Sequence, residues 1–177
     1  MDQLVAPWRI EWVERDGEEI DGCPFCVLPE RSDAREANIV AAADRAFVLL
    51  NNYPYNPGHA MVIPRAHTGA FTDLDEATLL EHARLKQRTI EALETALDPD
   101  GLNAGLNLGD GAGGSVDDHL HTHVVPRWTG DTNFMPVCAD TKVIVEAVDD
   151  TYERLHEAFA DQPDTTVVDS GAVRVDL

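Results

Sequence analysis

Short apolar runs separated by turn residues predict four β-strands in this chain. The predicted strands cover residues 46–50, 59–64, 102–108 and 119–125. Between the first two lies the segment 53–58, whose prolines fix φ and whose glycine permits positive φ. We therefore expect these two strands to form an antiparallel hairpin. Pro126 is expected to end the fourth strand.

Apolar residues recur at helical spacing over residues 72–97. Asp73 is the candidate N-cap, with Glu76 in capping-box register. The apolar stripe expected to face the core contains Leu80, Ala83, Ile90, Leu93 and Leu97. Residues 141–160 also have a helical pattern. Antiparallel strand pairs with a long helix between them predict an α+β fold, in which an antiparallel sheet carries one long helix and a C-terminal helix.

The length of 177 residues suits one domain with a sizeable core. We expect an N-terminal arm over residues 1–22, the folded domain over residues 23–160 and a mobile acidic tail over residues 161–177. No apolar run approaches the roughly 20 residues that span a bilayer. The N-terminus also lacks a basic stretch followed by an apolar one. The chain is therefore expected to act in the cytoplasm, without membrane contact.

Charge is the most unusual bulk property of the chain. Acidic residues outnumber basic ones by 33 to 13, the formal net charge is -20, and Lys86 and Lys142 are the only lysines. Such an acidic surface is typical of proteins adapted to high salt, where self-repulsion is screened. Binding to a nucleic-acid backbone is not expected, because it needs a basic footprint. A small phosphate ligand is compatible with this charge, since backbone N–H groups can build a local anion site.

The most specific chemical signal is the alternation of His119, His121 and His123. In a strand, alternate side chains point to the same face, about 6.5 Å apart. The three imidazoles are therefore expected to line one face. A polar strand face or a fortuitous metal site would explain a lone histidine. Three in alternation, beside the glycine-rich segment 109–115, favour a catalytic site instead.

A second group of residues points to a metal. Cys23 and Cys26 have C-x-x-C spacing, and an odd total of three cysteines argues against a disulfide framework. His67 and His119 are the best remaining ligands. Two thiolates and two imidazoles form the closed tetrahedral set typical of structural zinc, Zn2+. His59 is an alternative ligand, and a reduced cysteine pair packed in a core would need no metal.

These motifs resemble those of the histidine triad (HIT) superfamily. Residues 119–125 match its pattern of His-x-His-x-His followed by two apolar residues, and residues 57–67 resemble its hairpin. Together with Asn107 and residues 113–115, the similarity covers roughly residues 23–135. The segments that more narrowly resemble the diadenosine tetraphosphate phosphorylase branch are residues 52–59, 105–109 and 125–128.

The resemblance implies an enzyme that cleaves dinucleoside polyphosphates. His121 would attack the α-phosphorus of a nucleotide and form a nucleotidyl-histidine intermediate, which phosphate or water then releases. His123 would hydrogen-bond the phosphate or the leaving group and transfer a proton. The residues implied to hold phosphate oxygens are Asn107, Gly114 and Ser115. Thr122 departs from the usual apolar residue at its position, and only a packing effect is expected of it.

The resemblance also implies nucleotide contacts outside the triad. Asn51 is placed to reach a ribose hydroxyl. Phe47 and Leu49 are candidates to pack against the purine base, and the alternative is that both belong only to the hydrophobic core. Trp128 follows the triad strand and is a candidate to flank the second nucleotide. A homodimer is the expected assembly, with the long helix and a strand at its interface.

The metal set has a counterpart in superfamily members that carry the cysteine pair. They use the histidine after the Ile-Pro strand, here His67, and the first triad histidine, here His119. Two other functions stay open for the chain. A nucleoside phosphoramidate hydrolase would share His121 as its nucleophile and differ in the leaving-group pocket. A zinc-stabilised nucleotide-binding module would bind without turnover.

Overall fold

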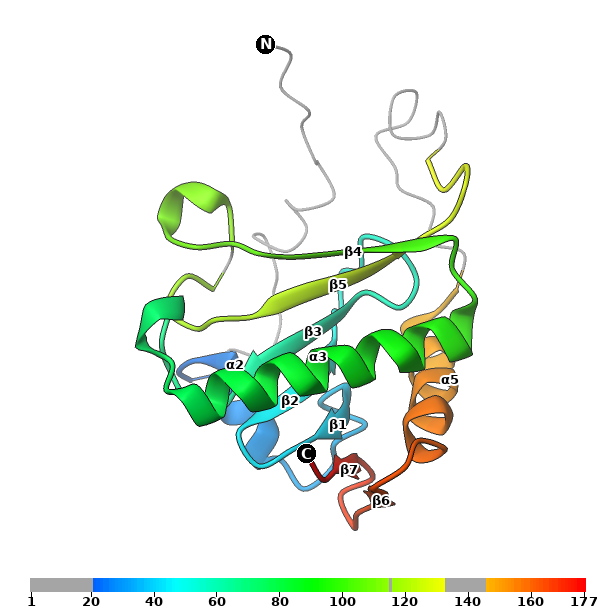
Figure 1. The fold of residues 1–177 in the computed structure, drawn as a ribbon, viewed down its shortest axis with the longest axis horizontal. Coiled ribbons are helices and arrows are strands. Elements are labelled where there is room, and N and C mark those ends of the chain that lie inside the picture. The colour runs from blue at the N-terminus through cyan, green and yellow to red at the C-terminus, as the bar shows by residue number, and fades with distance from the viewer. Residues whose placement is uncertain (1–20, 115, 133–145) are drawn as a thin grey trace.

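A computed structural model of the chain describes residues 21–114, 116–132 and 146–177 (Figure 1). Within them, one mixed sheet has the strand order β4-β5-β3-β2-β1-β7-β6. The strands are β1 (Ile39–Ala42), β2 (Ala46–Leu50), β3 (Ala60–Pro64), β4 (Gly101–Leu106), β5 (Thr122–Arg127), β6 (Thr165–Val167) and β7 (Val173–Val175). The helices are α2 (Pro24–Val27), α3 (Glu76–Leu97) and α5 (Val148–Ala160), with 3-10 turns η2 (Leu28–Glu30), η3 (Phe71–Asp73) and η4 (Asp110–Ala112). None of the helices in these residues is long and apolar enough to cross a membrane.

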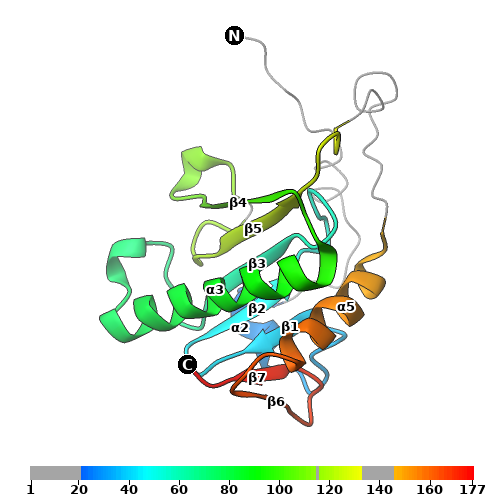
Figure 2. The ribbon, with the colours of Figure 1, turned by 45° about the vertical axis from the view of Figure 1, so that its right-hand side comes forward.

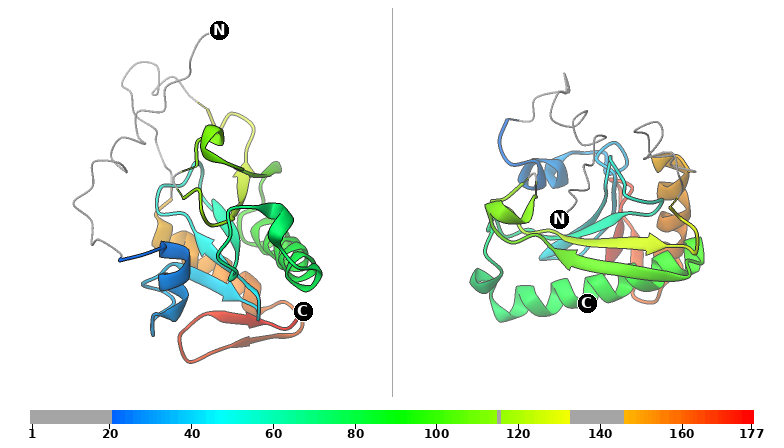
Figure 3. Two further views of the ribbon diagram at one scale, coloured as in Figure 1. Left: turned by 90° about the vertical axis from the view of Figure 1, so that its left-hand side faces the viewer. Right: turned by 90° about the horizontal axis from the view of Figure 1, so that it is seen from above.

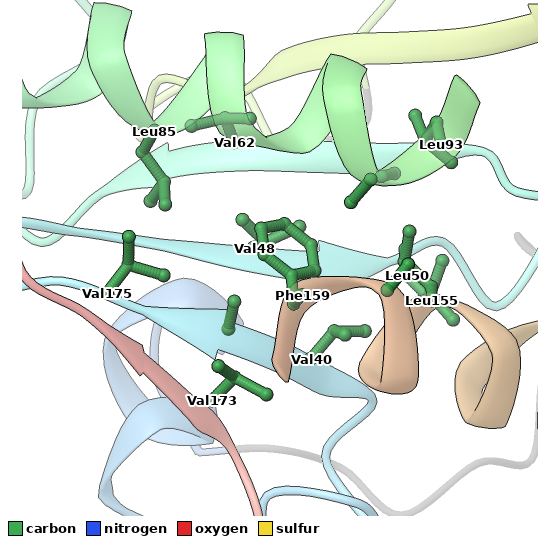
Figure 4. Close-up of a cluster of buried hydrophobic side chains, with 14 of the residues drawn as sticks. Val40, Val48, Leu50, Val62, Leu85, Leu93, Leu155, Phe159, Val173 and Val175 are labelled. Atoms are coloured by element: carbon green, nitrogen blue, oxygen red, sulfur yellow. The ribbon is translucent and has the colours of Figure 1, made fainter. Parts of the chain in front are cut away.

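The sheet separates two apolar clusters. Helices α3 and α5 cover one face, as Figure 2 shows, and α2 lies on the other (Figure 3). Strand β2 is buried throughout, and its residues alternate between the two clusters. Val48 and Leu50 join the cluster beneath α3 and α5 (Figure 4), whereas Phe47 and Leu49 join the cluster on the α2 face. This alternation decides which side chains can reach the triad face.

The predicted hairpin is confirmed, with β2 and β3 paired antiparallel from Ala46 opposite Pro64 to Leu50 opposite Ala60. Gly58, just before β3, has φ +77. A Cβ at this glycine would lie 2.3 Å from a side-chain carbon of Leu97 at the end of α3. Glycine is therefore required twice here, for its backbone conformation and for the close approach of the long helix.

The long helix begins at Glu76, four residues after the start of the predicted segment, and its N-cap lies two residues later than predicted. Residues 71–73 form η3, and Asp75, not Asp73, is the N-cap, its carboxylate accepting from Thr78 N at 2.7 Å. The predicted stripe is partly wrong, because Leu80 is 51% exposed and Ala83 is exposed as well. The residues that α3 buries are Thr78, His82, Leu85, Thr89, Ala92, Leu93 and Leu97. Several of these are polar, so hydrophobicity alone did not identify the buried face.

Residues 161–177 differ from the expected mobile tail, because they contain β6 and β7. Val173 and Val175 are buried, and β7 pairs parallel with β1, a strand that the sequence pattern did not indicate. The sheet is therefore mixed, although its other pairings are antiparallel. The two C-terminal strands have three residues each, and β7 meets β1 only through tertiary contact. Such short strands carry little local signal.

The triad strand also differs from its prediction at both ends. Strand β5 begins at Thr122 and runs through Pro126 to Arg127. Its pairing with β3 stops at Val124, while its pairing with β4 continues to Arg127. Pro126 therefore lies where β5 has a neighbour on one side, and a proline without an N–H is tolerated in such an edge position. The predicted C-terminal helix is present as α5, and residues 141–145 lie outside the described residues.

Candidate active site and metal-binding cluster

The three alternating histidines lie at the start of β5. His119 and His121 precede the strand and are 1% and 6% exposed, and His123 lies within it. The rings of His121 and His123 are 4.9 Å apart at their centroids and nearly perpendicular. Thr122, between them, points to the helical face, where it contacts His82 of α3. The predicted grouping of the imidazoles on one face is therefore present.

The hydrogen bond of His121 determines which ring nitrogen is free. Its Nδ1 lies 2.9 Å from the backbone oxygen of His119, and a carbonyl oxygen only accepts, so Nδ1 carries the proton. In the neutral ring, Nε2 then has an available lone pair. Phe25 of α2 packs against this ring with 5.1 Å between centroids. The middle histidine is thus held in the form that a nucleophile requires.

His123 is connected to a fourth histidine that is not part of the triad. His59, 1% exposed, has its Nε2 2.9 Å from His123 Nδ1. The backbone N–H of Tyr55 donates to His59 Nδ1 at 3.1 Å, and the Tyr55 ring stacks on the imidazole. A neutral His59 that accepts at Nδ1 must carry its proton at Nε2 and donate it to His123. The proton of a neutral His123 is then placed at Nε2.

The predicted phosphate-binding residues are only partly described. Asn107 Nδ2 lies 3.4 Å from His123 Nε2, so Asn107 is next to the outward face of that ring, and a half-turn of its amide brings Oδ1 there to accept from a protonated Nε2. Gly114 lies beside Asn107, since a Cβ on this glycine would be 3.5 Å from Asn107 Cβ. Asn107 therefore lies at the triad and Gly114 lies beside Asn107, and their phosphate-binding role stays a prediction. Ser115 lies outside the described residues.

The four predicted metal ligands lie together. One ligand atom from each of Cys23, Cys26, His67 and His119 lies within 4.8 Å of the others, and this group could bind a metal. His119 Nδ1 is 3.3 Å from Cys23 Sγ and 3.6 Å from Cys26 Sγ. His67 Nδ1 is 3.3 Å from Cys26 Sγ. His59 contacts His123, so the alternative ligand assignment is not supported.

The outer nitrogens of the two histidines have partners typical of metal ligands. His119 Nε2 donates to Pro64 O at 2.8 Å, and His67 Nε2 lies 3.6 Å from Asp118 Oδ2. The Pro64 carbonyl therefore fixes the proton of His119 at Nε2 and directs its Nδ1 lone pair toward the thiols, and Asp118 lies on the corresponding side of His67. Histidine ligands of metals are oriented by an outer carbonyl or carboxylate in this way.

Two pKa shifts agree with this arrangement. Burial lowers the pKa of His119, which favours the neutral imidazole that a metal needs. Burial, together with the hydrogen bond and charge of Cys23, raises the pKa of Cys26. A nearby cation would offset the cost of ionising the Cys26 thiol. The donor set therefore fits a thiophilic divalent cation such as zinc.

The candidate base and ribose contacts belong to the core or to the hairpin. Phe47 is fully buried and Leu49 is 6% exposed, in the apolar cluster on the triad face. This is the core interpretation that the sequence left open for both. Asn51 Oδ1 accepts from the backbone N–H of Tyr53 at 2.8 Å, and Asn51 Nδ2 lies 3.6 Å from Met61 Sδ. The Asn51 side chain thus stabilises the turn after β2.

Trp128, the candidate to flank the second nucleotide, lies away from the triad. Its side chain packs against the cluster beneath α3 and α5. Its backbone N–H donates to Asp131 Oδ2, which also receives Arg127 and Asn56. Alternation along β5 explains this placement, because Trp128 has the parity of Thr122 and Val124 and not that of the triad.

Sequence reasoning missed three residues of the site. Phe25 lies between the two cysteines and packs on both His119 and His121, with centroids 5.5 and 5.1 Å apart. His59 and Tyr55 belong to the hairpin and reach His123 from there. No local periodicity marks these contacts, because each one joins segments far apart in the sequence.

Comparison with known proteins identifies the class of this site. A hypothetical histidine triad nucleotide-binding protein of Sulfolobus tokodaii strain7 matches with a TM-score of 0.64 and 27% identity, covering 78% of this chain and 93% of that one. A Zn-bound histidine triad family protein of Mycobacterium smegmatis matches with a TM-score of 0.56 and 28% identity, covering 69% of this chain and 83% of that one. The fold and the triad are therefore those of histidine triad proteins.

The sequence match extends over most of the chain. Residues 33–130 match the HIT domain, and the chain belongs to this family. AP-4-A phosphorylase of Mycobacterium tuberculosis is 38% identical over 170 residues, which cover 92% of this chain and 87% of that protein. The prediction of an enzyme of the HIT family is confirmed by this relationship.

Proposed function

We propose that the protein cleaves dinucleoside polyphosphates such as diadenosine tetraphosphate through a nucleotidyl-histidine intermediate at His121. The observation that carries this proposal is the hydrogen bond from His121 Nδ1 to the His119 carbonyl, which leaves Nε2 as the free nucleophilic atom. Support comes from the relative that is named AP-4-A phosphorylase, which matches along most of its length.

The first step transfers the nucleotide to the enzyme. His121 Nε2 attacks the α-phosphorus, a P–N bond forms, and the P–O bond to the remaining polyphosphate breaks with its electron pair. Nε2–H of His123 stands beside Asn107, where it can donate to the departing oxygen or to a phosphate oxygen. Asn107 and the backbone around Gly114 would stabilise the charge that develops on phosphorus-bound oxygens, with Ser115 as a further expected contact.

The second step releases the nucleotide to an acceptor. Inorganic phosphate attacking the intermediate of diadenosine tetraphosphate would yield ADP, whereas water would yield AMP. ATP leaves in the first step in both cases. Incubation with this substrate, with and without phosphate, separates the two reactions by their products. ADP formed only with phosphate would indicate a phosphorylase, AMP and ATP in water would indicate a hydrolase, and no cleavage in either condition would contradict the proposal.

We further propose that the metal of the Cys23, Cys26, His67 and His119 cluster is zinc. Bound there, zinc would supply structural cross-linking, because four protein ligands leave no open position for substrate. The cluster would tie the segment containing α2 to the start of β5. Support comes from the ligand set and from the Zn-bound histidine triad protein of similar fold.

We propose a homodimer as the assembly. Strand β4 lies at one edge of the sheet, and its residues 103–105 are exposed. Among the described residues β4 has a neighbouring strand on one side only, and such an edge offers backbone groups to a second copy. Light scattering on the purified protein tests this, and a mass of one chain at micromolar concentration would contradict it.

A further inference from the structure

A polar pair lies in the apolar layer behind the triad strand. His82 of α3 and Thr122 of β5 are 4% and 2% exposed, and His82 Nε2 lies 3.1 Å from Thr122 Oγ1. Val62, Leu85 and Val124 are fully buried in the same layer. Figure 4 shows Val62 on β3 and Leu85 on α3. Polar groups buried in such surroundings are costly unless they are hydrogen-bonded.

The contacts of His82 define it as a hydrogen-bond donor. Its Nε2 also lies 3.2 Å from the backbone oxygen of Val62, which can only accept, so Nε2 carries the proton. Burial lowers the pKa of His82, and the charge of Lys86 acts in the same direction, against the hydrogen bond to Val62. The side chain is therefore a neutral imidazole whose Nε2–H is shared between the Val62 carbonyl and the Thr122 hydroxyl.

The position of Thr122 in β5 connects the His82–Thr122 pair to the triad. Thr122 lies between His121 and His123, and it pairs with Val62 in the β3–β5 ladder. Because side chains alternate, Thr122 points to α3 while the two histidines reach the opposite face. A shift of β5 by one residue would turn the histidines into the helical layer and withdraw Thr122 from His82.

We propose that His82 is a positioning residue for the triad. Through Thr122 and the Val62 carbonyl, it holds β5 in the register and at the depth at which His121 and His123 meet the substrate. The proposal rests on the proposed function of those two histidines. The apolar pattern of β5 opposes a one-residue shift, and the hydrogen bond from α3 to one residue of β5 also fixes the position of the strand along its axis.

Three variants test this role by separating catalysis from stability. His82→Leu removes the donor and is expected to lower kcat at least tenfold, with KM changed less than twofold. The double variant His82→Leu/Thr122→Val replaces both polar groups, so more than half of the lost Tm should return while kcat stays at least fivefold low. His82→Gln keeps an Nε2–H donor and should hold kcat within threefold of wild type.

Thr89→Val is the matched control. Thr89 is buried on α3, and its hydroxyl donates to Leu85 O within the same helix at 2.8 Å. This variant loses a buried hydrogen bond without touching β5, so its kcat should equal that of the wild type. Recovery of kcat together with Tm in the double variant would overturn the positioning role, because activity would then simply follow stability.

Amide hydrogen exchange supplies a readout that does not depend on activity. The amides of β5 should exchange at least tenfold faster in the double variant and at the wild-type rate in His82→Gln. Unchanged exchange in the double variant would overturn the proposal. Absence of dinucleotide cleavage by the wild-type protein would instead contradict the proposed function, and the exchange rates would still decide the role of His82.

Discussion

His59 Nε2 lies 2.9 Å from His123 Nδ1, and this contact joins the β2–β3 hairpin to the triad strand. The backbone N–H of Tyr55 donates to His59 Nδ1, so a neutral His59 accepts at Nδ1 and donates from Nε2 to His123. His123 is thereby left with its proton at Nε2, beside Asn107. A residue of the hairpin thus determines which nitrogen of a triad histidine can donate to substrate.

Replacing His59 is expected to slow proton transfer by His123. In His59→Phe, His123 has no fixed tautomer, and we expect kcat to fall by about 10²-fold, the lower end for a lost general acid. Steady-state kinetics measures this loss. The control is His156→Gln, since His156 bonds the Gly171 carbonyl on the other side of the sheet. Equal losses of kcat in both variants would contradict the assignment.

Replacing His121 is expected to separate binding from turnover. His121→Ala removes the attacking nitrogen, so turnover should fall by at least about 10³-fold, as for a lost nucleophile. Nucleotide affinity, measured by calorimetry, should change less than fivefold. A nucleotide-binding module without turnover predicts the opposite pattern, in which wild type and variant have the same negligible rate.

Loss of one thiol should release the metal and destabilise the protein. We expect about one zinc per chain in the purified protein, and less than a tenth of that in Cys26→Ser. Loss of this cross-link should lower Tm, because metal bound only to the folded state stabilises it. Elemental analysis and thermal unfolding measure the two effects. Cys138→Ser is the thiol control, and an equal loss of metal in that variant would contradict the ligand set.

The outer partner of His67 should have a smaller effect on metal affinity. Asp118 lies 3.6 Å from His67 Nε2 and is largely exposed. Asp118→Asn is expected to weaken metal binding by about 10-fold, the lower end for an outer-shell partner. Competition with a chromogenic chelator measures the affinity, and an unchanged affinity would show that Asp118 does not orient the ligand.

Acid should destabilise the fold in part through His82. Burial lowers its pKa, so the unfolded chain binds a proton near the ordinary value of about 6.5 while the folded chain does not. The contribution to stability is therefore full above pH 6.5 and is lost as the pH falls below that value. His82→Gln should narrow the difference in Tm between pH 7.5 and pH 5.5. An equally wide difference in that variant would contradict this source of acid sensitivity.

The sequence by itself determined the features that depend on local spacing. The Pro-Gly turn between two apolar runs specified the β2–β3 hairpin, and the alternation of three histidines specified the triad face. The spacing of the two cysteines predicted a metal site with His67 and His119 as the remaining donors, and the structure brings these four residues together. The hairpin and the triad could be predicted because each is encoded in a short stretch of sequence. The metal site could be predicted because few residues besides the two cysteines have side chains suited to bind zinc.

Only the tertiary structure decided which partners these residues meet. His59 and Phe25 contact the triad from other segments, and His82 reaches Thr122 from the long helix. These contacts join residues 40 to 96 positions apart, and packing, not local propensity, brings them together. The same reason explains β7, whose three residues become a strand only because β1 offers a free edge for parallel pairing.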